Sequence, residues 1–429
     1  MKKVFLVIVI LLTAGSVCSA AFWRDKIVAP EGSSNSWFGK SVSISGDVCV
    51  VGSDWDDITE YFEGSAFFFQ FDGSKWGSGK ELTSPDRTPY DCFGLSVSVS
   101  GQTCVVGAHL DSTEGESSGS AYVFHYNEPN WIQEIKLTAS DASSHDYFGT
   151  SVFIEGNICV VGSPEAYGNQ AVTGAAYIFQ FDGSNWIERQ KLFAPDSSHG
   201  DGFGNSVSLS DDVCIVGAPE DDDIIGGAGS AYVFRFEDPN WIQETKITAS
   251  DAAEYDHFGS SVSISGDVCV VGAPRHDQNG ESSGSAYIFR FNDPNWVQEV
   301  KLTPSDGAAW DRFGETVSIE GNVCIVGARN DDDSGEDSGS AYIFRFDGLG
   351  WIQGDKLAAF DAAAGDWFGR SVALDSGNIV VGADGKDGET GAVYTFRPCP
   401  QADLTGDCFV GTEDILIFAQ QWLTGQHLP

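Results

Sequence analysis

The chain has 429 residues, a formal net charge of −40, 12% aromatic residues and 51 glycines. So acidic a surface repels nucleic acid and anionic lipid and favours cations, so we expect no nucleic-acid partner. The aromatic and glycine content argues against disorder and for many short strands joined by tight turns.

The first residues have the three-part layout of a secretory signal peptide. Lys2 and Lys3 precede an apolar run over 4–12, and small residues follow around Ala20. The run is too short to span a bilayer, and no later stretch predicts a transmembrane segment. We therefore predict a signal peptide over 1–20 and an exported protein. Lipid attachment through Cys18 is a weaker alternative, because "GSVC" lacks the usual approach to a lipidated cysteine.

A Phe-Gly pair recurs every 55 residues, which identifies a repeated supersecondary unit. Each copy contains an alternating stretch such as "SVSIS", an apolar stretch such as "VCVVGA", then "SAYIFRF" and, after a short turn, "WVQEVKLTPSD". These patterns predict four strands per repeat and no helix, which is the size of one propeller blade. The seven pairs begin at Phe38, Phe93, Phe148, Phe203, Phe258, Phe313 and Phe368.

The first strand of the mature chain is expected to complete the last blade. Six tryptophan strands follow the first six Phe-Gly pairs, but none follows the seventh. The missing copy stands at the front as "FWRDKIVAP", where Trp23 and Lys26 match the repeated Trp and Lys. We therefore predict an all-β, seven-bladed β-propeller over residues 22–397, closed by the N-terminal strand without an exposed sheet edge.

Most of the ten cysteines are predicted to be packing residues. Six of them occupy the same slot of "VCVVGA" in successive repeats, and the seventh copy has Ile379 there. Equivalent positions in neighbouring repeats are normally too far apart for a disulfide, so these six are interpreted as small buried hydrophobic residues. They are Cys49, Cys104, Cys159, Cys214, Cys269 and Cys324.

The phrase "FGxSVSISGDVCVVGAP" followed by "GSAYIF" resembles the FG-GAP repeat, the unit of the seven-bladed propeller of integrin α chains and of many secreted bacterial proteins. The resemblance covers residues 22 to about 397 and implies an integrin-α-like propeller with a role in binding or cell adhesion. Many repeats of the family carry a D-x-D-x-D-G calcium loop between their first two strands. Here that junction is only "SGD", "SGQ", "EGN", "SDD" or "DSG", so we do not expect those calcium sites in the blades.

Acidic residues gather in the links between blades and in the long connections, which share one face. The links repeat as D-x4-D-x-F-G in six copies, for which turn formation by short carboxylates is the preferred explanation. Two triple aspartates are not repeated in every blade, and they are either solvated charge or ligands for divalent cations. They are Asp221, Asp222 and Asp223, and Asp331, Asp332 and Asp333.

No catalytic constellation can be recognised in the sequence, so we do not predict an enzyme. Single-copy residues that break the repeat were considered for nucleophile, base and metal-ligand patterns, and none fits. They are His109, His145, His199, His257, His276, Cys92 and Arg312.

After Pro398 the repeat stops, and residues 398–429 have the spacing of an EF-hand loop followed by an amphipathic helix. The alternative is an acidic turn before a helix. The segment resembles a dockerin half-repeat, which implies a calcium module and a cohesin-like receptor. Cys408 replaces the usual loop glycine, and a disulfide to Cys399 could brace the loop in an oxidising compartment. The ligand positions are Asp403, Thr405, Asp407, the Phe409 carbonyl, a water beside Gly411, and Asp414.

Together these features predict a secreted, non-catalytic binding or adhesion propeller. Its partner would be an extracellular protein or glycan, and a dockerin-like calcium module would attach or assemble it. The alternative function is an extracellular polysaccharide-acting enzyme, which an acid/base pair that breaks the repeat at the central opening would favour.

Overall fold

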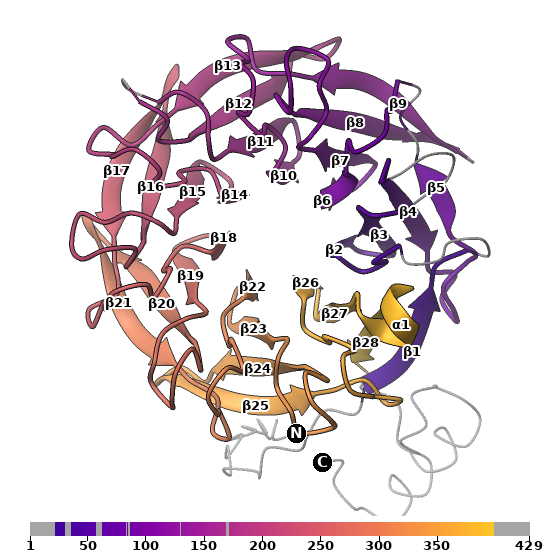
Figure 1. Cartoon of the computed structure of the whole chain (residues 1–429), viewed down its shortest axis with the longest axis vertical. Coiled ribbons are helices and arrows are strands. Elements are labelled where there is room, and N and C mark those ends of the chain that lie inside the picture. Colours follow the sequence, from indigo (N-terminus) through magenta and orange to yellow (C-terminus); the bar gives the residue numbers. More distant parts are fainter. Residues whose placement is uncertain are drawn as a thin grey trace, which may run out of the picture. The chain divides into compact units, whose positions relative to one another are not determined.

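The computed structural model describes residues 22–30, 36–56, 62–82, 84, 86–128, 130–168 and 171–398. Seven four-stranded sheets are arranged in a ring around a common axis, as Figure 1 shows. Within these ranges the helical content is a single turn, α1 (Lys386–Glu389). The predicted all-β, seven-bladed propeller is therefore confirmed.

In blades 1 to 6 the strands follow chain order from the centre of the ring to its rim (Figure 1). Blade 1 contains β2 (Ser41–Ser45), β3 (Val48–Ser53), β4 (Ser65–Gln70) and β5 (Lys80–Leu82). Blade 2 contains β6 (Phe93–Ser100), β7 (Thr103–Ala108), β8 (Ser120–Asn127) and β9 (Asn130–Leu137). Blade 3 contains β10 (Ser151–Glu155), β11 (Ile158–Ser163), β12 (Ala175–Phe181) and β13 (Trp186–Leu192).

Blade 4 contains β14 (Ser206–Ser210), β15 (Val213–Ala218), β16 (Ser230–Glu237) and β17 (Asn240–Ile247). Blade 5 contains β18 (Ser261–Ser265), β19 (Val268–Ala273), β20 (Ser285–Asn292) and β21 (Asn295–Leu302). Blade 6 contains β22 (Thr316–Glu320), β23 (Val323–Ala328), β24 (Ser340–Phe346) and β25 (Trp351–Leu357). The seventh sheet contains β26 (Ser371–Asp375), β27 (Asn378–Ala383), β28 (Ala392–Pro398) and β1 (Phe22–Val28), in the order β1-β28-β27-β26.

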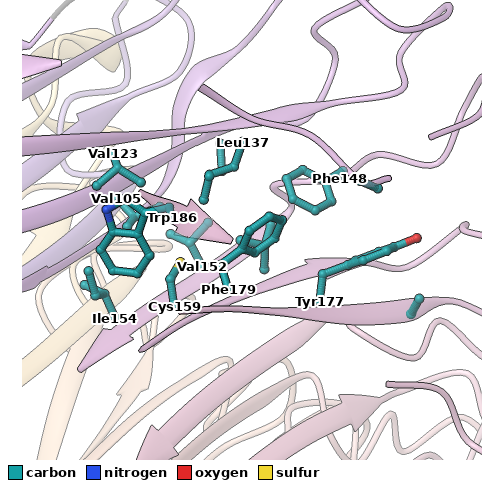
Figure 2. Packing of buried hydrophobic residues seen from close by; sticks show 14 of the residues in the cluster. Val105, Val123, Leu137, Phe148, Val152, Ile154, Cys159, Tyr177, Phe179 and Trp186 are labelled. Atoms are coloured by element: carbon teal, nitrogen blue, oxygen red, sulfur yellow. The ribbon is translucent and has the colours of Figure 1, made fainter. Parts of the chain in front are cut away.

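The hydrophobic core lies between neighbouring blades. Between blades 2 and 3, Val105 and Leu137 pack against Phe148, Cys159 and other residues of the next blade, as Figure 2 shows. The Phe148 ring meets the Tyr177 ring edge to face, with centroids 5.4 Å apart. Because every Phe of the Phe-Gly pairs is at most 1% exposed, each blade covers the apolar face of the one before it.

The Phe-Gly turn of one blade contacts the Gly-Ala/Ser strand end of the preceding blade. The Phe-Gly glycines have φ of +93° to +97°, a conformation that strongly favours glycine. Their carbonyl oxygens accept a hydrogen bond of 2.8–3.1 Å from the first hydroxyl of the preceding blade's inner strand, in all seven blades. The last of these bonds runs from Ser371 Oγ to the Gly39 carbonyl, between blades 7 and 1.

The six repeated cysteines are confirmed as buried residues with free thiols. Each is 0% exposed and is not in a disulfide. Burial raises the pKa of Cys49 to about 12, so the thiol stays protonated at neutral pH. The position therefore serves packing, as the isoleucine of the seventh copy indicates.

The links between blades contain a repeated set of contacts among two aspartates, a lysine and a tyrosine, here called the latch. In all six D-x4-D copies, the second aspartate accepts a backbone N–H from the residue three positions earlier, at 2.5–2.7 Å. The first aspartate pairs at 2.7–3.2 Å with a lysine of the next sheet. That lysine also lies 5.0–5.7 Å from the centroid of a buried tyrosine ring. The aspartate pairs therefore shape turns, as predicted, and also join blades.

Blade 1 departs from this latch. Glu81 stands at the position of the lysine, Phe67 at that of the tyrosine, and Ser36 at that of the second aspartate. Ser36 instead donates its hydroxyl to the carbonyl of Thr390, just before β28, at 3.2 Å. The contact between blades 7 and 1 therefore lacks this latch, and a different ion pair, between Arg397 of β28 and Asp47 of blade 1 at 3.1 Å, crosses it.

Gly272, in β19, tests the contact between blades. A Cβ there would overlap the Gly314 carbonyl oxygen of the next blade, whereas a Cβ at Gly350 would meet nothing within 4 Å. We expect Gly272→Ala to lower the free energy of unfolding by about 3 kcal/mol or more, and Gly350→Ala to change it by less than about 0.5 kcal/mol. Urea denaturation of both variants measures this, and equal effects would contradict the contact.

The second aspartates of the links predict a pH dependence of stability. Burial raises the pKa of Asp91, Asp201 and Asp311 to about 6. Between about pH 4 and 6 the folded chain therefore holds protons that the unfolded chain releases, so stability falls as pH rises through this window. We expect the melting temperature to decrease from pH 5 to pH 7.

A matched pair of variants separates burial from net charge. Asp311→Asn and Asp222→Asn each remove one negative charge, but Asp311 is 4% exposed and Asp222 is exposed. We expect Asp311→Asn to reduce the fall in melting temperature between pH 5 and pH 7 more than Asp222→Asn does. The amide oxygen of the asparagine can still accept the Ala308 N–H, but the side chain no longer titrates. Equal slopes for the two variants would show that burial of the link carboxyls is not the cause.

Candidate functional site

A channel runs along the axis of the ring between the inner strands. Its deeper part is a cavity of about 300 Å³ lined by repeated Val and Ser residues, together with Phe153 and Asp375. At the end where the Phe-Gly turns lie, it opens into a second cavity of about 390 Å³, here called the channel mouth. The residue after each Phe-Gly pair lines this mouth, because the inner strand starts there.

Charged residues at the mouth are confined to three adjacent blades. Glu315 of blade 6, Arg370 of blade 7 and Lys40 of blade 1 are charged, and the other four positions are uncharged. Those four are Leu95, Thr150, Asn205 and Ser260. One side of an otherwise sevenfold surface is therefore chemically distinct.

The three charged residues differ in their partners. Arg370 Nη1 donates to Glu315 Oε1 at 2.7 Å, and Arg329 Nε lies 3.4 Å from the same oxygen. Lys40 Nζ lies 4.9 Å from the centroid of the Trp37 ring. Within the described part of the chain no carboxylate forms an ion pair with Lys40. Lys40 is thus a half-buried cation that contacts an aromatic ring and forms no ion pair at close range, although Asp54 and Asp384 favour its charge from further away.

Behind the mouth, the proline of the "GAP" motif is replaced in the same part of the ring. Pro164, Pro219 and Pro274 keep it in blades 3 to 5. The replacements are Asp54, His109, Arg329 and Asp384, in blades 1, 2, 6 and 7. The sequence departs from its own repeat at two aligned positions in blades 6, 7 and 1.

The two aspartates behind the mouth are buried and only partly satisfied. Asp54 and Asp384 are each 2% exposed, and the Oδ1 atom of each has no hydrogen-bond partner among the residues described. Burial raises the pKa of Asp54 to about 6 and also raises the pKa of Asp384. Asp384 Oδ2 lies 3.6 Å from Arg370 Nε, so it helps to hold this arginine at the mouth. Neither aspartate lines the mouth itself.

A row of aromatic rings extends outward from Lys40. Trp37 stacks on Trp55 with centroids 4.1 Å apart and an angle of 8°. Phe62 follows at 4.6 Å from Trp55, and Tyr90 at 5.7 Å from Phe62. Trp55 is 37% exposed and Tyr90 55%, so the row offers apolar ring surface beside the mouth.

The buried member of each triple aspartate contacts one lysine and one tyrosine. Asp221 and Asp331 are buried, accept a tyrosine hydroxyl at 2.7 Å and lie 2.8 Å from a lysine, Lys246 and Lys356 respectively. Asp223 and Asp333 contact the same two lysines, and Asp222 and Asp332 are exposed. Across the described ranges no group of three or more His, Cys, Asp or Glu is placed to hold a metal ion. Cation binding by these aspartates stays a prediction.

The single-copy residues considered for catalysis are dispersed. Cys92 is buried and burial raises its pKa to about 12, so it is not a ready nucleophile. Burial lowers the pKa of His109 to about 4, and its Nδ1 has no partner within the described residues. His257 pairs with Glu220 at 3.4 Å and Arg312 with Glu315 at 4.0 Å. Of this set, His109 and Arg312 belong to the region around the mouth.

Sequence reasoning missed Lys40, Glu315, Arg370 and the two buried aspartates. It looked for catalytic residue types one at a time. Aligning the seven copies at the residue after Phe-Gly and at the "GAP" proline would have found them, because both positions become charged in blades 6, 7 and 1.

The predicted tail site cannot be placed. Asp403, Thr405, Asp407, Phe409, Gly411, Asp414 and the cysteines Cys399 and Cys408 lie outside the described residues, as does the predicted signal peptide. Among the residues described, no helix is long and apolar enough to cross a membrane.

Comparison with known proteins agrees with the geometry. No curated protein matches the chain. The family model described as "FG-GAP repeat" matches seven consecutive stretches, residues 23–69, 76–124, 131–179, 186–234, 241–289, 296–344 and 351–396. These stretches cover most of the chain and correspond to the repeats whose Phe-Gly turns and glycine contacts build the ring. The chain therefore belongs to the FG-GAP repeat family.

Proposed function

We propose that this protein is a secreted, non-catalytic binding propeller. It holds an extracellular protein or glycan at the face that carries the channel mouth, and a dockerin-like calcium module attaches or assembles it. The family supports this proposal, because the FG-GAP propeller is consistent with a binding or adhesion scaffold and its repeats are typical of extracellular proteins. The observation that carries it is the charged and aromatic cluster at the mouth.

The position of this cluster indicates a role in ligand binding and not in the stability of the ring. The glycine contact between blades repeats seven times and the latch six times, so stability alone favours repeated residues at equivalent positions. Lys40, Arg370 and Glu315 break this pattern together, on one side of one opening, and an exposed aromatic row adjoins them. Side chains that converge on a cavity from several blades are typical of ligand sites in propellers.

A polysaccharide-acting enzyme is the second candidate, and one observation favours it. Asp54 and Asp384 are buried carboxyls with raised pKa values beside the channel, which is a property of glycosidase acids. Neither residue lines the mouth, however, whereas Glu315, which does, is engaged by Arg370 and Arg329. A carboxyl that a substrate cannot reach is a poor general acid, so binding remains the preferred function.

We further propose that the N-terminal strand closes the ring after removal of a signal peptide. In support, Lys26 of β1 pairs with Asp361 at 2.8 Å, which is the same latch that joins the other blades. Ile27 is 5% exposed and packs in the cluster that contains Val380 and Val393. Both contacts put β1 in the role that the tryptophan strands have elsewhere.

The tail is proposed as the calcium site and the attachment module. The support is the spacing of its oxygen ligands, Asp403, Thr405, Asp407, Phe409 and Asp414, with a water position beside Gly411. A Cys399–Cys408 disulfide would brace this loop, and a cohesin-like receptor would be its partner.

The binding face can be tested on the whole protein with an array of extracellular glycans and proteins. Tyr90, Tyr255 and Trp310 precede three Phe-Gly turns and are 52–58% exposed. We expect the triple alanine variant to lose about tenfold or more of the affinity for any ligand found, because exposed aromatic side chains dominate binding energy at such faces.

The control removes equally exposed apolar residues from the rim. Ile132, Val297 and Ile352 are 49–52% exposed on the outer strands β9, β21 and β25. Their triple alanine variant should bind normally. Binding that depends on the rim and not on the face would contradict the proposal, and release of reducing ends from a bound polysaccharide would establish the enzyme instead.

The tail predicts where calcium binds. We expect calorimetry of the full-length protein to show calcium binding that an Asp403→Ala, Asp407→Ala variant loses, because both charge and coordination are removed. The control, Asp222→Ala with Asp332→Ala, removes two exposed carboxylates from the ring and should leave binding intact. Loss of binding in the control alone would move the calcium site to the acidic face.

A further inference from the structure

We propose that the channel mouth binds an acidic polysaccharide by holding a carboxylate or sulfate group between Lys40 and Arg370. This inference rests on the proposed binding function and names its ligand class. Lys40 and Arg370 come from adjacent blades, 1 and 7, and line the same cavity of about 390 Å³. This volume lies in the range of small-ligand sites, about 300–1,000 Å³.

The first argument is that Lys40 has no ion-pair partner among the described residues. Each lysine of the latches contacts one or more carboxylates, as Lys136 and Lys356 do. Lys40 instead faces an aromatic ring, and Arg370 and Arg329 disfavour its charge, whereas Asp54 and Asp384 favour it from behind the mouth. An oxyanion bound at the mouth would replace the water lost on burial and relieve this repulsion.

The arrangement behind the mouth keeps the cations available. Glu315 engages Arg370 through Nη1, and Asp384 approaches Nε, which fixes the guanidinium at the cavity wall. Burial, and to a smaller extent the charge of Arg370, lowers the pKa of Lys40. Asp54 and Asp384 act in the opposite direction, because their negative charges favour the ammonium form. The acidic residues therefore hold the cations without an ion pair to Lys40, so that an anion from outside can bind them.

The surroundings favour a sugar polymer over an acidic peptide. The aromatic row Trp37, Trp55, Phe62 and Tyr90 begins at Lys40 and presents exposed ring surface, on which pyranose rings can pack. Thr150, Asn205 and Ser260 line the opposite side of the mouth. Their side chains donate to backbone carbonyls at 2.7–3.3 Å, so their oxygen atoms are left to accept hydrogen bonds from sugar hydroxyls. A chain with an anionic group and several hydroxyls matches both sides of the cavity.

The test uses the full-length protein and four polymers: polygalacturonate, dextran sulfate, neutral dextran and poly-glutamate. We expect binding to polygalacturonate or dextran sulfate, with the stronger of the two identifying the anionic group. The Lys40→Gln, Arg370→Gln variant should weaken this binding about tenfold or more. The control variant, Lys75→Gln with Arg189→Gln, removes the same charge from two exposed sites elsewhere and should bind within about twofold of the wild type.

A third variant keeps the test decisive if the double variant does not fold. Leu95 lines the mouth in blade 2, and Leu95→Glu adds an anion there without removing a contact of Lys40 or Arg370. It should also weaken binding of the acidic polymer. Equal binding of neutral dextran, preference for poly-glutamate, or full affinity in both mouth variants would overturn the inference. If the array finds a ligand and the acidic polymers do not bind, the inference fails and the binding function stands.

Discussion

The ring depends on the close approach of two glycines from neighbouring blades. The carbonyl oxygen of each Phe-Gly glycine occupies the place that a Cβ would take on the glycine in the second strand of the preceding blade, as Gly314 does for Gly272. A hydroxyl of that preceding blade donates to the same oxygen. This contact sets the distance between the inner strands of neighbouring blades. It occurs seven times, and the seventh copy, between Ser371 and Gly39, joins blade 7 to blade 1. The buried phenylalanines, the channel width and the position of the mouth all follow from it.

The acidic residues of the chain also have a structural role. Many carboxylates of the face that carries the long loops form ion pairs with lysines of the outer strands. The same lysines contact the rings of buried tyrosines. The aspartates thus serve two purposes, since one of each link shapes the turn and the other joins two blades. Lys40 differs from these lysines, because it contacts an aromatic ring and forms no ion pair among the described residues.

Periodic features were predicted from the sequence, whereas the charged residues that break the period were missed. The spacing of Phe38 and its equivalents indicated the blades, the isoleucine at position 379 indicated the burial of the cysteines, and "SGD" indicated a connection between the first two strands too short for a calcium loop. Lys40 and Arg370 are 330 positions apart, so they become neighbours only when the copies are aligned and the ring is closed. The triple aspartates were isolated in the sequence, and the lysine that pairs with each set lies more than 20 residues away.

The seam between blades 7 and 1 is built differently from the other six contacts between blades. It lacks the lysine, the tyrosine and the second aspartate of the other links. Instead, Arg397 of β28 pairs with Asp47 of blade 1 at 3.1 Å and lies 3.7 Å from the centroid of the Phe71 ring. Lys40 and Arg370 stand on the two sides of the seam. A ligand that bridges them would therefore add one more contact across this seam and would stabilise it against local unfolding while it is bound.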